Sequence, residues 1–403
     1  MPSGVRDFLP RAAARRRSLA EKVLEVFEAW GYARLITPMF ECADVLERGL
    51  GAGARAAAIR FVEPGTGEVV ALRPDITPQI ARVVATRMAE IPGPIRLCYE
   101  GAVTRLAGEH GQREILQAGI ELVDAPEPDG DAEVLAVAAS ALARLDLPET
   151  RLDVGHVAPA AFVLSTAPDP GARLMLVAAL GRKDRAGLRV AARVLPEGIA
   201  PLAEALATLW GPASATLDRA EALPWPAPVK QSLAQLRAVL AAFGALAEPP
   251  VPSLTIDLGD LRGFDYYTGV RFAAYAGGAP DAVLRGGRYD ELLAKYGRAA
   301  QATGFAIDLE AVAQAQRSIG VAAPAAGFGV AVDEPELARA IRKRGIRVVT
   351  QQRAPASWGA WLRGAGLDAA VVGDRLIRHD DSARDLNGAR EDIDRLIALL
   401  KST

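Results

Sequence analysis

The stretch RGFDYYTGVRF, which starts at Arg262, places several polar side chains together in a chain with only 5% aromatic residues. Five of the seven tyrosines lie between positions 266 and 296, so this clustering is local. A buried tyrosine needs a hydrogen-bond partner for its hydroxyl. Together with Arg262 and Asp265, Tyr266 and Tyr267 could line a pocket for a small polar ligand. The alternative is a sheet corner filled by aromatic rings whose hydroxyls face water, and spacing alone leaves both interpretations open.

Two other segments favour the pocket. In QAGIEL, Gln117 and Glu121 are four residues apart in a predicted strand, so both face the same side. Glu121 is a lone carboxylate on an otherwise apolar strand, which is costly unless it meets a cation or several donors. In RPDIT, Arg73, Asp75 and Thr77 alternate just before a predicted helix, and a helix cap explains only one of them. Carboxylates, an arginine, an amide and tyrosines around one cavity would suit a zwitterion such as a free amino acid.

The elements that must position these residues are typical of an α+β fold. The patterns predict strands over residues 32–41, 68–73, 95–103 and 114–123, and helices over 19–30, 77–90 and 131–145. Runs of strands with few crossover helices favour an antiparallel sheet. Pro38 lies inside the first predicted strand and cannot donate to a ladder, so we expect this strand at an edge or an interface.

The second half of the chain changes character twice. Residues 165–248 are rich in Ala, Leu and Arg and are punctuated by prolines, which predicts a helical insertion into a core that spans 1–320. The segment GVAAPAAG at 320–327 is typical of a linker. After it, short apolar strands alternate with helical patterns, so residues 326–403 are expected to form a small α/β domain.

Composition excludes several classes of function. The 403 residues carry a net charge of −2, whereas a general nucleic-acid binder would carry a basic excess. Cys42 and Cys98 are too few for a disulfide framework or a zinc site, and none of the three histidines has metal-ligand spacing. No apolar run resembles a signal peptide or a membrane span. We therefore expect a cytoplasmic protein with no metal, no cofactor, no membrane contact and no nucleic-acid partner.

Taken together, these segments resemble the catalytic core of class II aminoacyl-tRNA synthetases, and specifically histidyl-tRNA synthetase. RGFDYY is similar to that family's RGLDYY histidine-binding signature, LRPDIT to LRPEGT with Asp75 for the glutamate, and QAGIEL to the Q-x-G-x-E strand. YARLITPMFE resembles motif 1 with its proline, and GVRDFLP and GGRYDEL also match. The resemblance covers most of residues 4–320. It implies an antiparallel sheet flanked by helices, and a homodimer formed through motif 1 near Pro38.

The resemblance also implies which residues bind histidine. The matching positions are Asp75, Thr77, Arg105, Gln117, Glu121, Arg262, Tyr266 and Tyr267. The nucleotide half is less complete. The family's motif 2 runs F-R-x-E, and this chain keeps Arg105 but has Ala107 in place of the glutamate. Motif 3 ends G-φ-x-x-G-φ-E-R, where φ is apolar, and here Asp308 replaces a glycine and Ala311 replaces the arginine.

The physical consequence of these replacements is weaker binding of ATP. A charge-assisted arginine–phosphate contact contributes about 1.5–3 kcal/mol, and Asp308 adds a negative charge near the expected triphosphate. Amino-acid activation needs both substrates held in line. A site with only the amino-acid half is a receptor and not an activating enzyme.

That combination resembles the regulatory subunits of ATP phosphoribosyltransferase, a synthetase-like family of histidine biosynthesis. The resemblance implies a non-catalytic protein that assembles with a short-form catalytic subunit into a hetero-octamer, supports the first step of the pathway and confers feedback by histidine. Whether the pocket or a subunit interface is the feedback site stays open. The C-terminal domain resembles a trimmed anticodon-binding domain. The alternatives are an active histidyl-tRNA synthetase with unusual motifs, and an RNA-binding sensor on the same fold, which the near-neutral charge disfavours.

Overall fold

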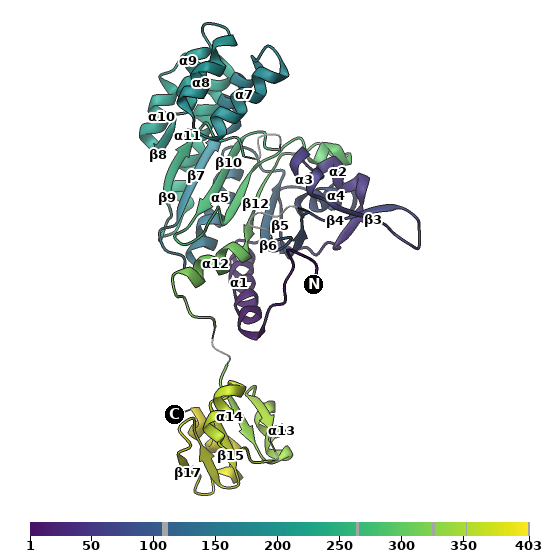
Figure 1. Cartoon of the computed structure of the whole chain (residues 1–403), viewed down its shortest axis with the longest axis vertical. Helices are drawn as coiled ribbons and strands as arrows, with labels where there is room; N and C mark the ends of the chain where they lie inside the picture. Colours follow the sequence, from purple (N-terminus) through teal and green to yellow (C-terminus); the bar gives the residue numbers. More distant parts are fainter. Residues whose placement is uncertain (107–111, 263–265, 325–326, 352, 402–403) are drawn as a thin grey trace. The chain divides into compact units, whose positions relative to one another are not determined.

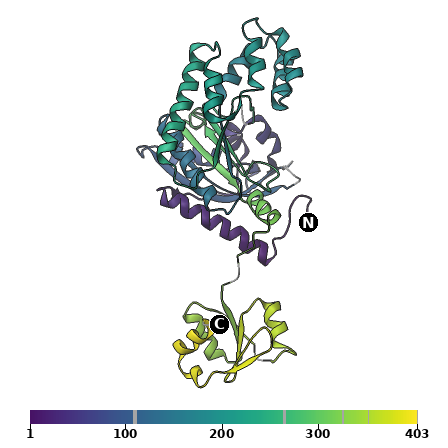
Figure 2. The ribbon, with the colours of Figure 1, turned by 90° about the vertical axis from the view of Figure 1, so that its left-hand side faces the viewer.

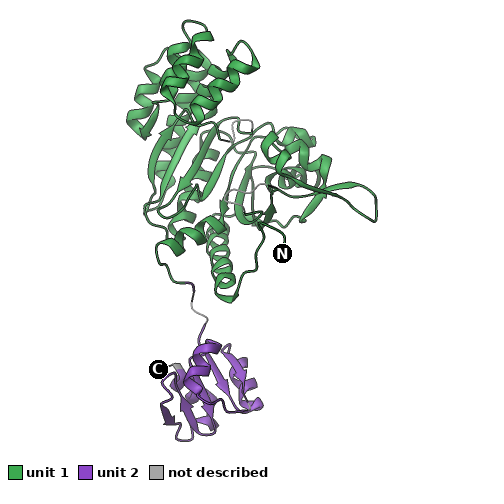
Figure 3. Ribbon diagram, viewed as in Figure 1, with its two compact units in different colours: residues 1–322 green, residues 323–403 purple. Residues whose placement is uncertain are grey.

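The structure is a computed structural model of the chain, and it describes residues 1–106, 112–262, 266–324, 327–351 and 353–401 (Figure 1). The chain divides into two compact units, Met1–Ala322 and Ala323–Thr403 (Figure 3). Each unit has its own hydrophobic core, so we describe them separately. Within the described ranges, no helix is both long and apolar enough to cross a membrane.

A nine-stranded sheet forms the centre of the first unit. In order across the sheet, its strands are β1 (Ala33–Arg34), β5 (Ile95–Thr104), β6 (Glu114–Val123), β12 (Ala302–Asp308), β11 (Leu284–Arg288), β10 (Val270–Tyr275), β7 (Arg151–His156), β9 (Ser253–Asp257) and β8 (Trp210–Pro212). Neighbouring strands are antiparallel, except that β1 pairs parallel with β5 and β7 pairs parallel with β9. The prediction of an α+β fold around a mainly antiparallel sheet is confirmed.

Helices cover one face of this sheet because the strands alternate apolar residues toward it. The helices α1 (Pro10–Ala29), α5 (Asp129–Ala143) and α12 (Leu309–Ser318) lie against this face (Figure 1). Along β5, Cys98 belongs to the core beneath these helices, whereas its neighbours Leu97 and Tyr99 pack on the opposite face. That opposite face is covered by α4 (Thr77–Arg87) and the short 3-10 helix η3 (Leu293–Tyr296). The two faces therefore have separate packing, and the candidate site lies on the second one.

The segment around Pro38 differs from the prediction of a single strand over 32–41. It forms two short strands, β1 in the large sheet and β2 (Phe40–Cys42) in a separate three-stranded sheet. Pro38 lies between them because it has no N–H for a ladder. The guanidinium of Arg73 donates instead to the carbonyls of Thr37 and Pro38, at 2.9 and 3.3 Å. β1 is an edge strand, as predicted for this segment.

The three-stranded sheet has the order β2-β4-β3. It contains β3 (Ile59–Val62) and β4 (Val69–Leu72) beside β2, and the helices α2 (Ala43–Gly49) and α3 (Ala52–Ala57) connect β2 to β3. Several apolar side chains of this sheet and of the preceding segment are exposed, and they are Ile36, Met39, Phe40, Phe61, Val62 and Val69. Phe40 and Phe61, whose ring centroids lie 6.1 Å apart, share one face of the small sheet, and Val62 and Val69 share the other. We call the six residues together the apolar patch.

The helical stretch lies between β7 and β9 and starts earlier than the expected residue 165. Its elements are α6 (Val157–Ser165), α7 (Pro170–Gly181), α8 (Arg185–Ala191), η2 (Ala192–Val194), α9 (Ala200–Leu206), α10 (Ala213–Glu221) and α11 (Ala227–Leu246). These helices gather at one end of the sheet, as both views show (Figures 1 and 2). The early start arises because the His156 side chain caps α6, accepting from the backbone N–H of Ala158 at 3.1 Å. Strand β8, which the helical pattern did not predict, pairs with β9.

The second unit is a small α/β structure. Its five-stranded sheet has the order β14-β13-β15-β16-β17, and its elements are β13 (Gly329–Val332), α13 (Pro335–Lys343), β14 (Arg347–Thr350), α14 (Trp358–Ala365), β15 (Ala369–Val372), β16 (Arg375–Ile377), β17 (Ala383–Asp385), η4 (Ala389–Glu391) and α15 (Ile393–Lys401). β14, β13 and β15 are parallel, and β16 and β17 extend the sheet antiparallel.

Candidate functional site

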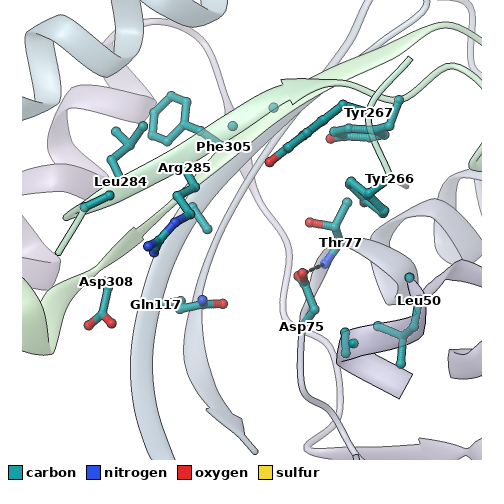
Figure 4. A pocket seen from close by; sticks show the side chains of 18 of the residues that line it. Leu50, Asp75, Thr77, Gln117, Tyr266, Tyr267, Leu284, Arg285, Phe305 and Asp308 are labelled. Carbon is teal, nitrogen blue, oxygen red and sulfur yellow. Dashed lines mark hydrogen bonds between the residues drawn. The ribbon is translucent and has the colours of Figure 1, made fainter. Parts of the chain in front are cut away.

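A cavity of about 410 Å³ opens on the α4 face of the large sheet. Its floor is formed by β6, β12 and β11, and one wall is formed by residues 50–54, which are the short connection between α2 and α3 and the first turn of α3. Figure 4 shows Asp75, Thr77, Tyr266 and Tyr267 on one side of the cavity, and Arg285 and Asp308 on the other. The volume suits a molecule of amino-acid size.

The acidic side of the cavity is built by a contact between α4 and β6. Thr77 is the first residue of α4, and its hydroxyl donates to Glu121 Oε1 at 2.6 Å. The carboxylate of Asp75 accepts from the backbone N–H of Thr77 at 3.1 Å, so it holds the turn that precedes α4. One residue of RPDIT therefore fixes this turn, and another orients Glu121. Arg73 does neither, because it is buried against the segment around Pro38.

Four buried polar atoms in or beneath the cavity have no hydrogen-bond partner among the described residues. They are Gln117 Oε1, Glu121 Oε2, Tyr266 Oη and Tyr289 Oη. Buried polar groups are almost always paired, because leaving one unpaired costs about 1–3 kcal/mol. The concentration of such atoms around one cavity is typical of a site that is completed by a ligand.

The tyrosines form a compact aromatic group over the cavity. The rings of Tyr266 and Tyr267 pack edge to face with centroids 5.4 Å apart, and those of Tyr266 and Tyr289 lie 5.2 Å apart. All three residues line the cavity, and their rings pack against the core around Ile76 and Leu292. This decides between the two interpretations of the tyrosine cluster, since the Tyr266 hydroxyl is buried and does not face water.

Burial dominates the electrostatics of this end. It raises the pKa of Glu121 well above its ordinary value of 4.5, although the hydrogen bond from Thr77 opposes the shift. Burial also raises the pKa of Tyr266, and the nearby carboxylates of Asp75 and Glu121 add to the effect. A cationic or hydrogen-donating ligand group beside Glu121 would lower the pKa of Glu121 again, since it would stabilise the ionised carboxylate.

A glycine makes room for the Glu121 carboxylate. Gly304 of β12 lies opposite Glu121 in the sheet. A Cβ at position 304 would lie 2.3 Å from Glu121 Oε2 and 2.7 Å from Tyr289 Oη. Real Cβ atoms essentially never approach so closely. Position 304 therefore requires glycine because the Glu121 and Tyr289 side chains lie so close to it, and not because of its backbone conformation.

The structure brings together most, but not all, of the eight residues in the predicted site. Asp75, Thr77, Gln117, Tyr266 and Tyr267 line the cavity, as does Arg105, and Glu121 lies directly beneath its floor. Arg105 donates through Nε to the carbonyl of Pro74 at 3.1 Å. Asp265, which the sequence grouped with the tyrosines, lies outside the described residues.

Arg262 is the exception, because its guanidinium is paired beside the cavity. It makes hydrogen bonds of 2.9 to 3.1 Å with the carboxylate of Asp260, which also pairs with Arg271 at 2.8 Å. Burial alone would raise the pKa of Asp260, but these two arginines hold it below its ordinary value. Arg262 is not among the described residues that line the cavity.

Two polar side chains that line the cavity, Arg285 and Tyr289, are outside the site predicted from the sequence. Tyr289 lies in the segment GGRYDEL, which resembles the family, and Arg285 directly precedes that segment. The signal that could have found Arg285 is the alternation along β11, which points every second residue to the cavity face.

The residues at the positions expected to bind the nucleotide have structural roles of their own. Asp308 ends β12 and caps α12, accepting from the backbone N–H groups of Glu310 and Ala311 at 2.9 Å each. Its carboxylate lines the cavity, and burial raises its pKa.

Glu310 pairs with Arg6 and Arg16, at 2.9 and 2.7 Å, and so anchors the N-terminal segment. Ala107, the expected motif 2 position, lies outside the described residues. Within the described ranges, no group of three or more His, Cys, Asp or Glu residues is arranged to hold a metal ion.

Known proteins with similar sequences belong to the family that the motifs of this cavity resemble. The family model for histidyl-tRNA synthetase matches residues 4–312, so the fold and the site define a member of the histidyl-tRNA synthetase family. Two curated relatives are ATP phosphoribosyltransferase regulatory subunits. The one from Anaeromyxobacter dehalogenans is 46% identical over 322 residues, covering 78% of this chain and 90% of the relative. The one from Moorella thermoacetica is 38% identical over 381 residues, covering 91% and 97%.

A solved structure from Bacillus halodurans extends the similarity to three dimensions. It is described as an ATP phosphoribosyltransferase regulatory subunit/histidyl-tRNA synthetase. It superposes with a TM-score of 0.80 at 26% identity and covers 92% of this chain and 97% of the other. Within the synthetase-like proteins, the chain belongs to the family of ATP phosphoribosyltransferase regulatory subunits.

Proposed function

We propose that this chain is a non-catalytic subunit that binds histidine in the cavity and makes a separate ATP phosphoribosyltransferase catalytic subunit sensitive to it. The observation that carries the proposal is the asymmetry of the cavity. The end near Glu121 has three buried polar atoms, on Glu121, Tyr266 and Tyr289, without a hydrogen-bond partner among the described residues. At the other end, Asp308 and Ala311 stand at the two positions where the synthetase motif has a glycine and a phosphate-binding arginine.

The chemistry of the acidic end favours an imidazole and an ammonium group. Glu121 Oε2 and the Tyr266 hydroxyl can accept or donate toward the two ring nitrogens of an imidazole. Asp75 lines the same end, and Gln117 lines the cavity two rows along β6 from Glu121; both can accept from an ammonium group. Histidine carries both groups. A smaller amino acid without the ring would leave Glu121 unpaired, which costs a ligand about 1–3 kcal/mol.

The expected nucleotide end supports the non-catalytic part of the proposal. The N-terminus of α12 could otherwise attract phosphate, but the Asp308 carboxylate already occupies its backbone N–H groups. The alternative is an active histidyl-tRNA synthetase, and Arg105, which lines the cavity, is the observation that favours it. An assay of histidine-dependent ATP–pyrophosphate exchange separates the two. We expect no exchange, and measurable exchange would establish the synthetase activity.

Assembly is the second part of the proposal. We expect a homodimer through the apolar patch and the segment around Pro38, and a hetero-octamer with the short-form catalytic subunit in the cytoplasm. Phe61 and Val62 are 40% and 60% exposed, which is costly for an unpartnered surface. Feedback requires that histidine bind one arrangement of this assembly more tightly than another.

The ligand is tested by titrating L-histidine into the chain by calorimetry. We expect Glu121→Ala to weaken binding about 10- to 100-fold, because a charged hydrogen bond contributes about 1.5–3 kcal/mol. Tyr266→Phe should weaken binding less, since it removes a neutral hydrogen bond. If both variants bind like the parent, the cavity is not the histidine site and the feedback site lies elsewhere, for example at a subunit interface.

The regulatory role is tested by co-purification of the chain with a short-form catalytic subunit. We expect histidine to inhibit the catalytic subunit only when that subunit is in the complex.

A further inference from the structure

The floor of the cavity is organised in rows that run across the sheet. Directly opposite residues in neighbouring strands share a face, and the next row on that face lies two residues along, roughly 7 Å away. One row joins Glu121 of β6 to Gly304 of β12 and Gly287 of β11. The next row joins Gly119 to Ala306 and then to Arg285. Arg285 is therefore one row along and two strands across from Glu121.

Small residues between these two side chains leave the space open. Gly119 and Ala306 occupy the middle of the Arg285 row, and Gly304 occupies the middle of the Glu121 row. Neighbouring strands lie about 4.8 Å apart, so the long side chain of Arg285 can reach across its row toward the cavity. Figure 4 shows its guanidinium directed into the cavity between Gln117 and Asp308, across from Asp75 and Thr77.

The two ends of the cavity thus differ in charge, because the first end carries carboxylates and the second carries the Arg285 guanidinium together with the Asp308 carboxylate. The acidic end, with Asp75 and Glu121, suits the cationic groups of an amino acid, and its carboxylate must then point to the other end. Among the described residues that line the cavity, the cationic side chains are Arg105 and Arg285. Arg105 is tied through Nε to the carbonyl of Pro74. Arg285 pairs with Asp281 through Nη2 at 2.5 Å, and a guanidinium has five donors in a plane that can serve two carboxylates.

Arg262 is the competing candidate, and the geometry sets it apart. Its guanidinium is 51% exposed, binds Asp260 in a fork, and lies 3.9 Å from the same Asp281 carboxylate that pairs with Arg285. Asp281 therefore links the two arginines, but only Arg285 lines the cavity.

We propose that Arg285 binds the carboxylate of the ligand and thereby selects an amino acid over its alcohol or amine analogues. The inference rests on the proposed function, because it names a contact within the same histidine site. It adds a specificity-determining residue on β11 that lies outside the eight residues predicted from the sequence.

The experiment measures two dissociation constants for each variant by calorimetry. The probes are L-histidine and L-histidinol, in which a hydroxymethyl group replaces the carboxylate. The parent should bind histidine about 10- to 100-fold more tightly than histidinol, as expected for a charge-assisted contact. Arg285→Met should weaken histidine binding by about that factor and leave histidinol binding unchanged, so that the preference disappears. Arg285→Lys, which keeps the charge without the fork, should keep part of the preference.

Arg237→Met is the matched control, because Arg237 is likewise an arginine paired with carboxylates, those of Asp218 and Glu221, on the helical stretch. It should keep the full preference. The proposal is overturned if Arg285→Met retains the preference for histidine, and Arg262→Met, measured in parallel, then shows whether Arg262 supplies the contact. General damage to the fold would weaken both probes equally and leave the ratio intact, which also counts against the proposal. If the parent binds neither probe, the proposed function itself fails.

Discussion

At the scale of single residues, the site depends on one carboxylate that is expensive in the absence of a ligand. Glu121 is 3% exposed, receives one hydrogen bond from Thr77 and has one oxygen without a partner. Such a residue lowers the stability of the empty protein, and it persists only where a function needs it. The raised pKa of Glu121 is the measurable sign of this cost.

The first prediction follows from the sign of that shift. Because the folded-state pKa of Glu121 is raised above 4.5, the empty folded protein holds its proton longer than the unfolded chain does. The contribution to stability is present below pH 4.5 and is lost as pH rises toward the folded-state pKa. Glu121→Gln removes the ionisation, so its melting temperature should exceed that of the parent at pH 8 and match it near pH 4.5. Thermal unfolding of both proteins without ligand measures this.

Added histidine supplies the control for this prediction. It should raise the melting temperature of the parent more than that of Glu121→Gln, since the variant has lost the charged contact. A parent protein that is more stable than the variant at pH 8 without ligand would contradict the account of Glu121 as a strained, ligand-dependent carboxylate.

At the scale of elements, the junction between β7 and α6 illustrates how a buried histidine can be structural. His156 is 5% exposed and caps α6 through Nδ1. Burial, with a smaller contribution from Arg288, lowers its pKa to about 4. The ring is therefore neutral at pH 7, as an acceptor must be. This residue was not assigned a role from the sequence, and the structure gives it one at the start of the helical stretch.

The second prediction concerns the pH dependence that this cap confers. Because the folded-state pKa is below the ordinary value of 6.5, the stabilisation is present above pH 6.5 and is lost as pH falls toward 4. Between pH 7 and pH 5 the parent should lose about 2 kcal/mol of unfolding free energy through this residue. His156→Asn retains a capping oxygen and should lose less over the same range. Urea unfolding at both pH values tests this, and equal losses in the two proteins would disprove it.

At the scale of the whole molecule, the apolar patch and the cavity belong to one continuous structure. Arg73 follows β4 directly and donates to the carbonyls around Pro38, and Asp75 and Thr77 lie two and four residues further on. A homodimer contact at this patch would therefore press on the segment that starts α4. This gives a physical route by which assembly and ligand binding can influence each other, provided that the patch is the interface.

The third prediction tests that interface. Phe61→Glu places a charge within the patch and should weaken self-association about 30-fold or more, the effect of losing a central apolar contact of at least 2 kcal/mol. Leu174→Glu is the control, because Leu174 is an exposed apolar residue of α7, at 68% exposure, and lies outside the patch. Light scattering over a range of concentrations measures the dimer. A Phe61→Glu dimer as tight as the parent would place the interface elsewhere.

The sequence determined the class of fold and most of the cavity, because both follow from local patterns. Alternation along strands specified that Gln117 and Glu121 share a face, and the tyrosine cluster indicated buried hydroxyls. The strand, turn and helix boundaries around Thr77 follow from neighbouring residues, and so does the cost of a lone glutamate on an apolar strand.

Only the tertiary structure decided which arginine faces the cavity. Arg262 and Arg285 are equally charged in sequence, but the fork with Asp260 holds the first, while the register of β11 against β12 directs the second. The segment around Pro38 is likewise held by Arg73, more than thirty residues further along the chain. Such outcomes depend on pairings between distant segments, and the free energy of each pairing depends on which other groups the fold has already brought within reach.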